Sequence, residues 1–154
     1  MCMDRRIPAK DAKQIIGLIP KEGKTVYKIV GVVDGKYHPV SIHTREPFGV
    51  GAIKADTSVK IHTWDNEYKS GFHFFQTKVD AVGSLDYLNE RLADRQMREK
   101  IKSNMDDMKE IVHDKYAVIE CIVKKSWVTA IGVDGGSQEA ITVVAKKAIF
   151  PEVK

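Results

Sequence analysis

One helical stretch lies between two regions of strand-like sequence, and this order constrains the fold more than any other feature of the chain. From residue 79 onward, apolar residues recur at three- and four-residue steps, the spacing of an amphipathic helix. The stripe consists of Val79, Val82, Leu85, Leu88 and Leu92, and after a one-residue slip continues with Met97, Ile101, Met105, Met108 and Ile111 or Val112. Thr77 followed by Asp80 has the spacing of a capping box. We therefore expect helices at about 78–91 and 93–112.

Strand-like segments precede and follow this stretch. Residues 26–42 favour a hairpin around the turn Asp34–Gly35, and short candidate strands lie near residues 50–55, 58–64 and 70–75. Residues 116–133 and 140–150 return to the strand pattern. Because the connections between strands are too short for repeated helical crossovers, the sequence predicts an α+β fold. We expect a largely antiparallel sheet with the helical segment at about 78–112 packed on it.

The chain is expected to form one domain preceded by a lead-in segment. A length of 154 residues is enough to bury a single hydrophobic core. Residues 1–24 are the lead-in, in which DAKQIIGLI predicts a short helix that docks on the α+β domain of residues 25–154. The docking side chains are expected to be Ile15, Ile16, Leu18 and Ile19.

Charge, hydropathy and cysteine content exclude several classes of protein. A formal net charge of +4 is too small, and its lysines too dispersed along the chain, for a dedicated nucleic-acid binder, so a nucleic-acid partner is not expected. The chain lacks the run of ~20 apolar residues that spans a bilayer, which favours a soluble protein. Cys2 and Cys121 lie far apart without paired histidines, so we expect a reduced, cytoplasmic protein with no disulfide and no metal site.

The segment SGFHFF places a histidine inside an apolar run. In a strand, Phe72 and Phe74 point to one face, which we expect to be the core, and His73 points to the other. Two interpretations remain open: His73 hydrogen-bonds a neighbouring segment, or it is the polar group of a pocket near the start of the helix at Thr77, where backbone N–H groups attract anions. The candidate ligand-binding residues are His73, Ser70, Gly71 and Tyr27.

Glu120 and the methionines of the helical segment each allow two interpretations. Glu120 lies in the apolar run AVIECIV, either at an exposed edge or buried with a partner; a buried carboxylate has a raised pKa and is a candidate for function. Met97, Met105 and Met108 belong either to the core or to an adaptable surface for a protein partner.

Short motifs in the chain resemble those of small uncharacterised phage and prophage proteins. The matching stretches are Tyr27–Lys28, 48–51, 70–73, Asp80–Ala81, 116–120 and 145–149. Those proteins often carry a cysteine pair around S-G-F-H, which this chain lacks, and the helical segment at 89–114 is longer here. The resemblance implies no known activity. What it implies is a protein of phage type.

A second likeness is to ADP-ribosyltransferases. Gly71-Phe72-His73, Ala81, Tyr87 and Glu120 are similar in order to that family's motifs. The resemblance implies an NAD-using enzyme in which Tyr87 helps to hold the nicotinamide and Glu120 stabilises the oxocarbenium charge. The family's His-Gly or Arg-Gly on the first strand is missing, since that strand reads YKIVG.

From these observations we expect a protein that acts by binding rather than by catalysis and needs no cofactor. Its target is expected to be a host or defence protein, or else a small ligand held near His73, with homo-oligomer formation left open. The alternative is the ADP-ribosyltransferase-like enzyme with NAD as its cofactor.

Overall fold

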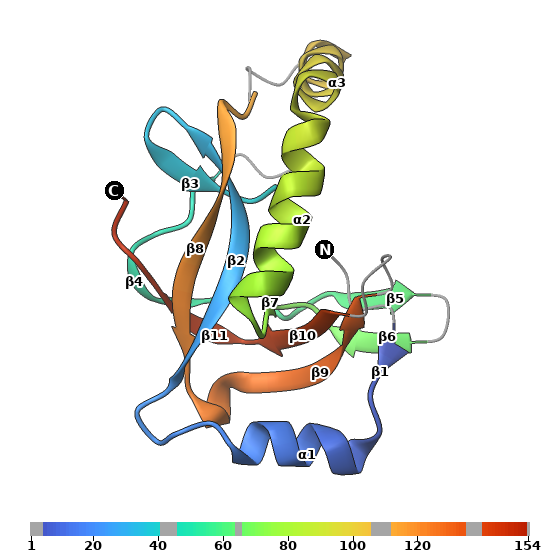
Figure 1. Cartoon of the computed structure of the whole chain (residues 1–154), viewed down its shortest axis with the longest axis vertical. Coiled ribbons are helices and arrows are strands. Elements are labelled where there is room, and N and C mark those ends of the chain that lie inside the picture. Colours follow the sequence, from blue (N-terminus) through green and yellow to red (C-terminus); the bar gives the residue numbers. More distant parts are fainter. Residues whose placement is uncertain (1–4, 41–45, 64–65, 106–111, 135–139, 154) are drawn as a thin grey trace.

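The computed structural model describes residues 5–40, 46–63, 66–105, 112–134 and 140–153, and shows an α+β fold with a mostly antiparallel sheet (Figure 1). The helices in these ranges are α1 (Ala9–Gly17), α2 (Lys78–Glu90), α3 (Leu92–Met105) and the 3-10 turn η1 (Lys125–Trp127). The strands are β1 (Arg5–Arg6), β2 (Lys24–Val33), β3 (Lys36–His38), β4 (Gly51–Lys54), β5 (Lys60–Thr63), β6 (Asn66–Lys69), β7 (Phe72–Phe75), β8 (Lys115–Val123), β9 (Val128–Asp134), β10 (Ala140–Ala145) and β11 (Lys147–Phe150). The predicted fold class is confirmed.

The main sheet turns back on itself. Its strand order is β1-β9-β10-β7-β2-β8-β11-β4, with β3 attached to β2, and its described pairs are antiparallel. Only Lys146 separates β10 from β11, so these two are one strand that bends. The path from β10 through β7, β2 and β8 to β11 therefore returns to the same strand and forms a small barrel-like ring. The pair β5–β6 forms a separate two-stranded sheet.

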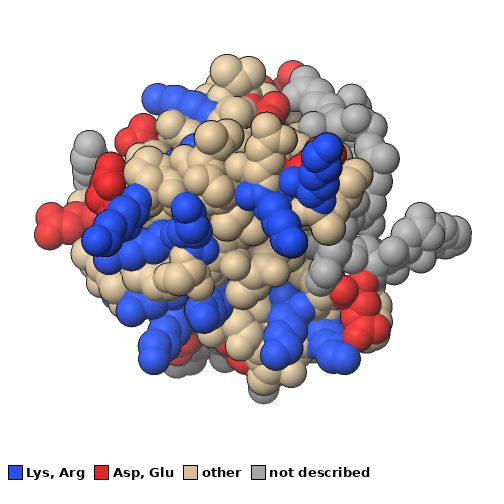
Figure 2. All heavy atoms as spheres, turned by 90° about the horizontal axis from the view of Figure 1, so that it is seen from below, with Lys and Arg blue, Asp and Glu red and all other residues tan. Residues whose placement is uncertain are grey.

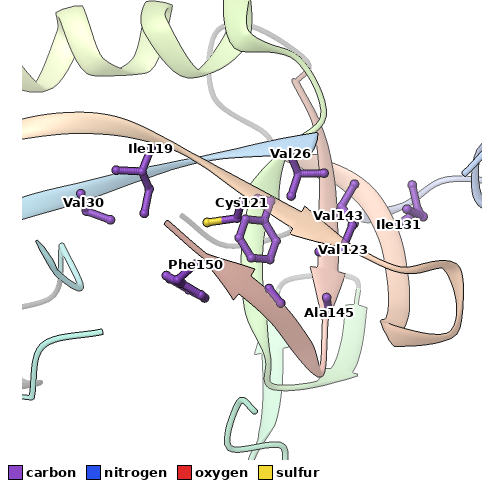
Figure 3. Packing of buried hydrophobic residues seen from close by; sticks show 11 residues of the cluster. Val26, Val30, Ile119, Cys121, Val123, Ile131, Val143, Ala145 and Phe150 are labelled. Carbon is purple, nitrogen blue, oxygen red and sulfur yellow. The ribbon is translucent and has the colours of Figure 1, made fainter. Parts of the chain in front are cut away.

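The inward-facing side chains of this ring form the hydrophobic core. They come from β2, β7, β8, β10 and β11 of the ring and from β9, and Figure 3 shows how Val26, Cys121, Val123 and Val143 lie close together. The buried members are Val26, Val30, Phe74, Ile119, Cys121, Val123, Ile131, Val143, Ala145, Ala148 and Phe150. Phe74 is fully buried and Phe72 packs partly buried against the cluster, so the predicted core face of SGFHFF is confirmed. Cys121 is buried and free, and burial raises its pKa to about 12; Cys2 lies outside the described residues.

Local sequence explains the elements that position the helices. The Oγ1 of Thr77 accepts a hydrogen bond from the backbone N–H of Asp80 at 3.3 Å, which caps α2 as predicted. Asp34 and Gly35 have φ values of 50° and 71°, the left-handed conformation that a two-residue hairpin turn requires. The helix predicted in the lead-in begins at Ala9 and ends at Gly17, and its Ile15 and Ile16 pack on the core.

The helical faces differ from the prediction. In α2, Ala81 is the buried residue, whereas Val79 is 80% exposed. In α3 the buried residues are Glu99 and Ser103, while the side chains of the predicted stripe point outward: Met97 is 61%, Ile101 53% and Met105 79% exposed. The core interpretation of this methionine stripe is therefore wrong, and Met108 lies outside the described residues. Leu18, predicted to dock, is exposed as well.

Candidate functional site

A pocket of about 500 Å³ lies between α2 and the place where β2 and β7 diverge, here called the α2–β7 pocket. The register of β2 and β7 contains a single described pair, Tyr27 opposite Phe75, so the two strands separate beyond it. The pocket is lined by Lys28, Ile29, Pro39, Val40, His73, Phe75, Ser84, Tyr87, Leu88, Arg95 and Asp134. Its wall therefore combines apolar side chains with a few polar groups, which is the usual composition of a small-molecule site.

His73 lines this pocket, but its ring nitrogens already have partners. Its side chain is 8% exposed. Nδ1 lies 3.1 Å from the carbonyl of Gly71, an acceptor, so Nδ1 carries the hydrogen and Nε2 accepts the hydroxyl proton of Tyr68 at 2.8 Å. Burial, with a smaller contribution from the charge of Lys28, lowers the pKa of His73 to about 4. His73 is therefore a neutral, fixed wall residue, which favours the first of the two interpretations.

Arg95 connects the pocket to a buried polar cluster. Its Nε donates to the hydroxyl of Tyr116 at 2.9 Å, and that hydroxyl donates to Oε1 of Glu99 at 3.1 Å. The same carboxylate accepts the ring N–H of His113 at 2.9 Å and the backbone N–H of His113 at 3.0 Å. These bonds hold the Arg95 guanidinium at the pocket wall and over the Tyr116 ring, 5.5 Å from its centroid.

The cluster pairs a buried histidine with a buried carboxylate. Nδ1 of His113 lies 2.9 Å from the Glu99 carboxylate, and Nε2 lies 3.1 Å from the carbonyl of Pro39, so each ring nitrogen faces an acceptor. Burial pushes the pKa of Glu99 upward, but the hydrogen bonds and the charge of His113 together hold it below its ordinary value. Gly31 permits this arrangement, because a Cβ at that position would overlap the His113 ring. The Glu99 carboxylate can be buried in α3 because Tyr116 and His113 donate hydrogen bonds to it.

Lys28 is an unusual member of the pocket wall. It alternates with Val26 and Val30 along β2, so its side chain enters the ring interior. Its Nζ donates to the carbonyl of His73 at 2.9 Å and lies 5.4 Å from the Phe74 ring centroid. Part of the side chain is exposed, but the ammonium end is enclosed, and burial lowers its pKa to about 8 against a small opposing effect of Cys121.

The other predicted ligand-binding residues lie away from the pocket lining. Gly71 permits a close backbone approach, since a Cβ there would lie 2.8 Å from the carbonyl oxygen of Ala145. Ser70 donates its hydroxyl hydrogen to the carbonyl of Asp56 at 2.8 Å. Tyr27 packs beneath α2 against the cluster of Phe75, Ala81 and Ala140. Of the four candidates, only His73 reaches the pocket.

The two residues assigned to the enzyme alternative are not brought together. Tyr87 lines the α2–β7 pocket, and its ring contacts the Arg91 guanidinium at 4.8 Å. Glu120 lies opposite Tyr27 in the β2–β8 ladder, is exposed, and is not part of the pocket lining. Glu120 is therefore exposed and not buried, although its strand β8 lies between β2 and β11 and not at a sheet edge.

Sequence reasoning missed Ser84, Arg95 and Lys28 as pocket residues. Ser84 lies one helical turn before Leu88 and on the same face, which could have been derived from helical spacing. Arg95 belongs to a charged run that resembles any solvated helix surface. Lys28 lies on the same face of its strand as Val26 and Val30, and lysine is rarely buried. A lysine at an inward-facing position could therefore have been recognised from the sequence as a candidate site residue.

Comparison with known proteins gives no relative for this chain. Among the described residues, no group of three or more histidine, cysteine, aspartate or glutamate side chains is arranged to hold a metal ion. None of the described helices is both long and apolar enough to cross a membrane. No family model matches the sequence, and neither a curated protein nor a solved structure is significantly similar to it.

Proposed function

We propose that the protein acts by binding a small ligand in the α2–β7 pocket. The observation that carries this proposal is the pocket itself: about 500 Å³ of space, with an apolar wall from β2, β7 and α2 and a guanidinium fixed at its side. The proposal keeps the expectation from the sequence that this is a phage-type protein.

The polar groups of the wall define the chemistry of the ligand. His73 has both nitrogens engaged, so its ring is not the group that turns to a ligand. The other polar groups of the wall are the Lys28 ammonium, the Asp134 carboxylate, the hydroxyls of Ser84 and Tyr87 and the terminal nitrogens of Arg95. A guanidinium recognises carboxylates through paired N–H donors. Ile29 and Leu88 supply apolar contact. The ligand is therefore a small organic acid with an apolar or aromatic body.

The test is binding of simple aromatic carboxylates, such as benzoate, followed by NMR of ¹⁵N-labelled protein. Backbone signals of residues 84–88 and 73–75 should shift in a saturable manner. Ser84→Phe fills the pocket and should abolish these shifts, whereas Asn89→Phe, on the exposed side of the same helix, should preserve them. Absence of saturable shifts, or equal loss in both variants, would reject the proposal. A saturable response to NAD that Glu120→Gln removes would instead favour the enzyme alternative.

A second candidate function is protein binding through α3. The exposed Met97, Ile101 and Met105 form an apolar face on this helix, and flexible methionines suit an adaptable contact. Light scattering at micromolar concentration should show self-association or, with a cognate partner present, complex formation. Ile101→Lys should abolish either one without changing the circular dichroism spectrum. A monomer that binds nothing in pull-down experiments would exclude this candidate.

A further inference from the structure

A second pocket, here called the basic pocket, lies where η1, the chain after β4 and the β10–β11 bend meet. It measures about 420 Å³ and is lined by Lys54, Ala55, Thr57, Ser126, Trp127, Lys146 and Lys147. Backbone hydrogen bonds join the three segments: the N–H of Ala55 donates to the Lys146 carbonyl, and the N–H of Lys146 donates to the Trp127 carbonyl, each at 2.9 Å. The pocket is therefore held by the sheet framework and not by side chains alone.

Two lysines of the basic pocket form a cross-strand pair. Lys147 lies directly opposite Lys54 in the β11–β4 ladder, and like charges at such positions destabilise a sheet. The ion pairs found among the described residues, Lys60 with Glu67, His62 with Glu67 and His113 with Glu99, include none of these lysines. An anion bound between Lys54 and Lys147 would convert this repulsion into attraction.

Trp127 adds a stacking surface among these charges. Trp127 is partly exposed, and the Nζ atoms of Lys124 and Lys147 lie 5.4 Å and 5.0 Å from the centroid of its ring. Proteins that bind single strands combine such cations with an aromatic ring on which a base stacks. A base on Trp127 would replace one ammonium contact, and the released ammonium would then reach a phosphate.

The positive charge extends beyond the basic pocket. Nζ of Lys125 in η1 donates to the carbonyl of Gly17 at 3.3 Å, so η1 adjoins the C-terminal end of α1. Helix α1 itself carries Lys10 and Lys13. Figure 2, seen from the side of α1, shows lysine and arginine side chains spread over this face, with most acidic side chains near its edges. A face of this extent fits a polyanion better than a single nucleotide.

We propose that this face binds single-stranded nucleic acid, with phosphates held by Lys54, Lys146 and Lys147 and one base stacked on Trp127. This site shares no lining residue with the α2–β7 pocket, so it stands independently of the function proposed above. Affinity should depend on salt and only weakly on base sequence, because the lysines contact the backbone and every base has a face that can stack.

Fluorescence anisotropy of the full chain with a labelled oligothymidylate of roughly 15 nucleotides tests the proposal. With about three phosphates contacted, the logarithm of the binding constant should fall with the logarithm of salt concentration at a slope near −2. Lys147→Gln should weaken binding and reduce this slope by about 0.7, whereas Trp127→Ala should weaken binding roughly tenfold with the slope unchanged. Circular dichroism would verify that both variants fold.

The control is Lys100→Gln, which removes one exposed positive charge from α3, remote from η1 (Figure 1). Its affinity should remain close to that of the parent protein. Equal losses for Lys100→Gln and Lys147→Gln would show diffuse attraction to the whole surface and overturn the assigned site. Absence of binding at low salt, or tighter binding to anionic vesicles or a phosphopeptide than to the oligonucleotide, would overturn the proposal itself.

Discussion

Replacing Lys28 by methionine should stabilise the protein at neutral pH. The folded chain holds an ammonium inside the ring, where burial lowers its pKa from 10.5 to about 8. At about 1.4 kcal/mol for each pKa unit, the buried charge destabilises the fold by roughly 3 kcal/mol at pH 7. Lys28→Met keeps the shape of the chain but loses the bond to the His73 carbonyl, worth about 1 kcal/mol, and the ring contacts. We expect a net gain of about 1–2 kcal/mol.

The dependence on pH gives a sharper test than the stability at one pH. Between pH 8 and pH 10.5 the folded protein has lost the Lys28 proton while the unfolded chain still holds it. Because the unfolded state binds more protons in this window, stability rises with pH. Cys121 works in the opposite direction, since its folded pKa of about 12 lies above the ordinary value of 9.0. The difference between parent and Lys28→Met therefore reports the titration of Lys28 together with its coupling to Cys121.

Urea denaturation at pH 7 and pH 10 measures both quantities. The advantage of Lys28→Met over the parent should be present at pH 7 and should shrink or reverse at pH 10. Lys100→Met, which removes an exposed ammonium from α3, should leave stability within about 0.5 kcal/mol at both values. The reasoning is refuted if Lys28→Met is destabilising at pH 7 and its difference from the parent does not change with pH.

Three further predictions follow from the buried polar residues. The folded pKa of His73 is about 4, below the ordinary value of 6.5, so the unfolded chain binds the extra proton between these values. The free energy of unfolding should therefore fall by up to about 3 kcal/mol as the pH drops from 6.5 to 4. If His73→Gln lost as much stability over the same pH range, this prediction would be contradicted. Glu99→Gln removes the carboxylate from its buried pair with His113 and should cost about 3–5 kcal/mol in urea denaturation, with the exposed Glu90→Gln nearly neutral. Gly31→Ala places a methyl group against the His113 ring and should lower the melting temperature, whereas Gly17→Ala, which meets no neighbour, should not.

Elements set by local sequence were predicted well. The predicted cap at Thr77 and the predicted start of α2 agree with the structure because the capping bonds involve only residues 77–80. The Asp34–Gly35 turn likewise depends on its own backbone conformation. The antiparallel arrangement followed from short connections, but the ring did not, because it requires the bend at Lys146, and no local signal marks which strands its two halves join.

The faces of the helices could not be predicted from apolar spacing. The α3 helix packs Glu99 inward because His113, 14 residues further along the chain, offers its backbone N–H and its ring as hydrogen-bond partners. A hydrophobic pattern counts apolar residues and does not detect such a pair, so it favoured the core over a partner surface for the stripe that contains Met97 and Ile101. Only knowledge of the long-range contact between α3 and the start of β8 would have reversed that assignment.

The basic pocket illustrates the same limit for charge. Lys54 and Lys147 are separated by 93 positions in sequence, which made the lysines look dispersed, yet the β11–β4 ladder places them opposite each other. The expectation that nucleic acid is not a partner depended on that apparent dispersal. Which charged side chains lie close together in the folded protein depends on the strand register, and the register cannot be read from the sequence.

The ring also determines when the chain can fold during synthesis. Its central ladder joins Val26 to Cys121, and its closure needs β10 and β11, which occupy residues 140–150. Until the ribosome has released that segment, β7 lacks its neighbour on one side and the apolar side chains of β2 and β8 have no opposite wall. Contacts between residues so distant in sequence form slowly. The nascent protein must therefore remain without its core until translation of this region ends, a period in which a chaperone that shields strand edges would raise the yield of folded protein.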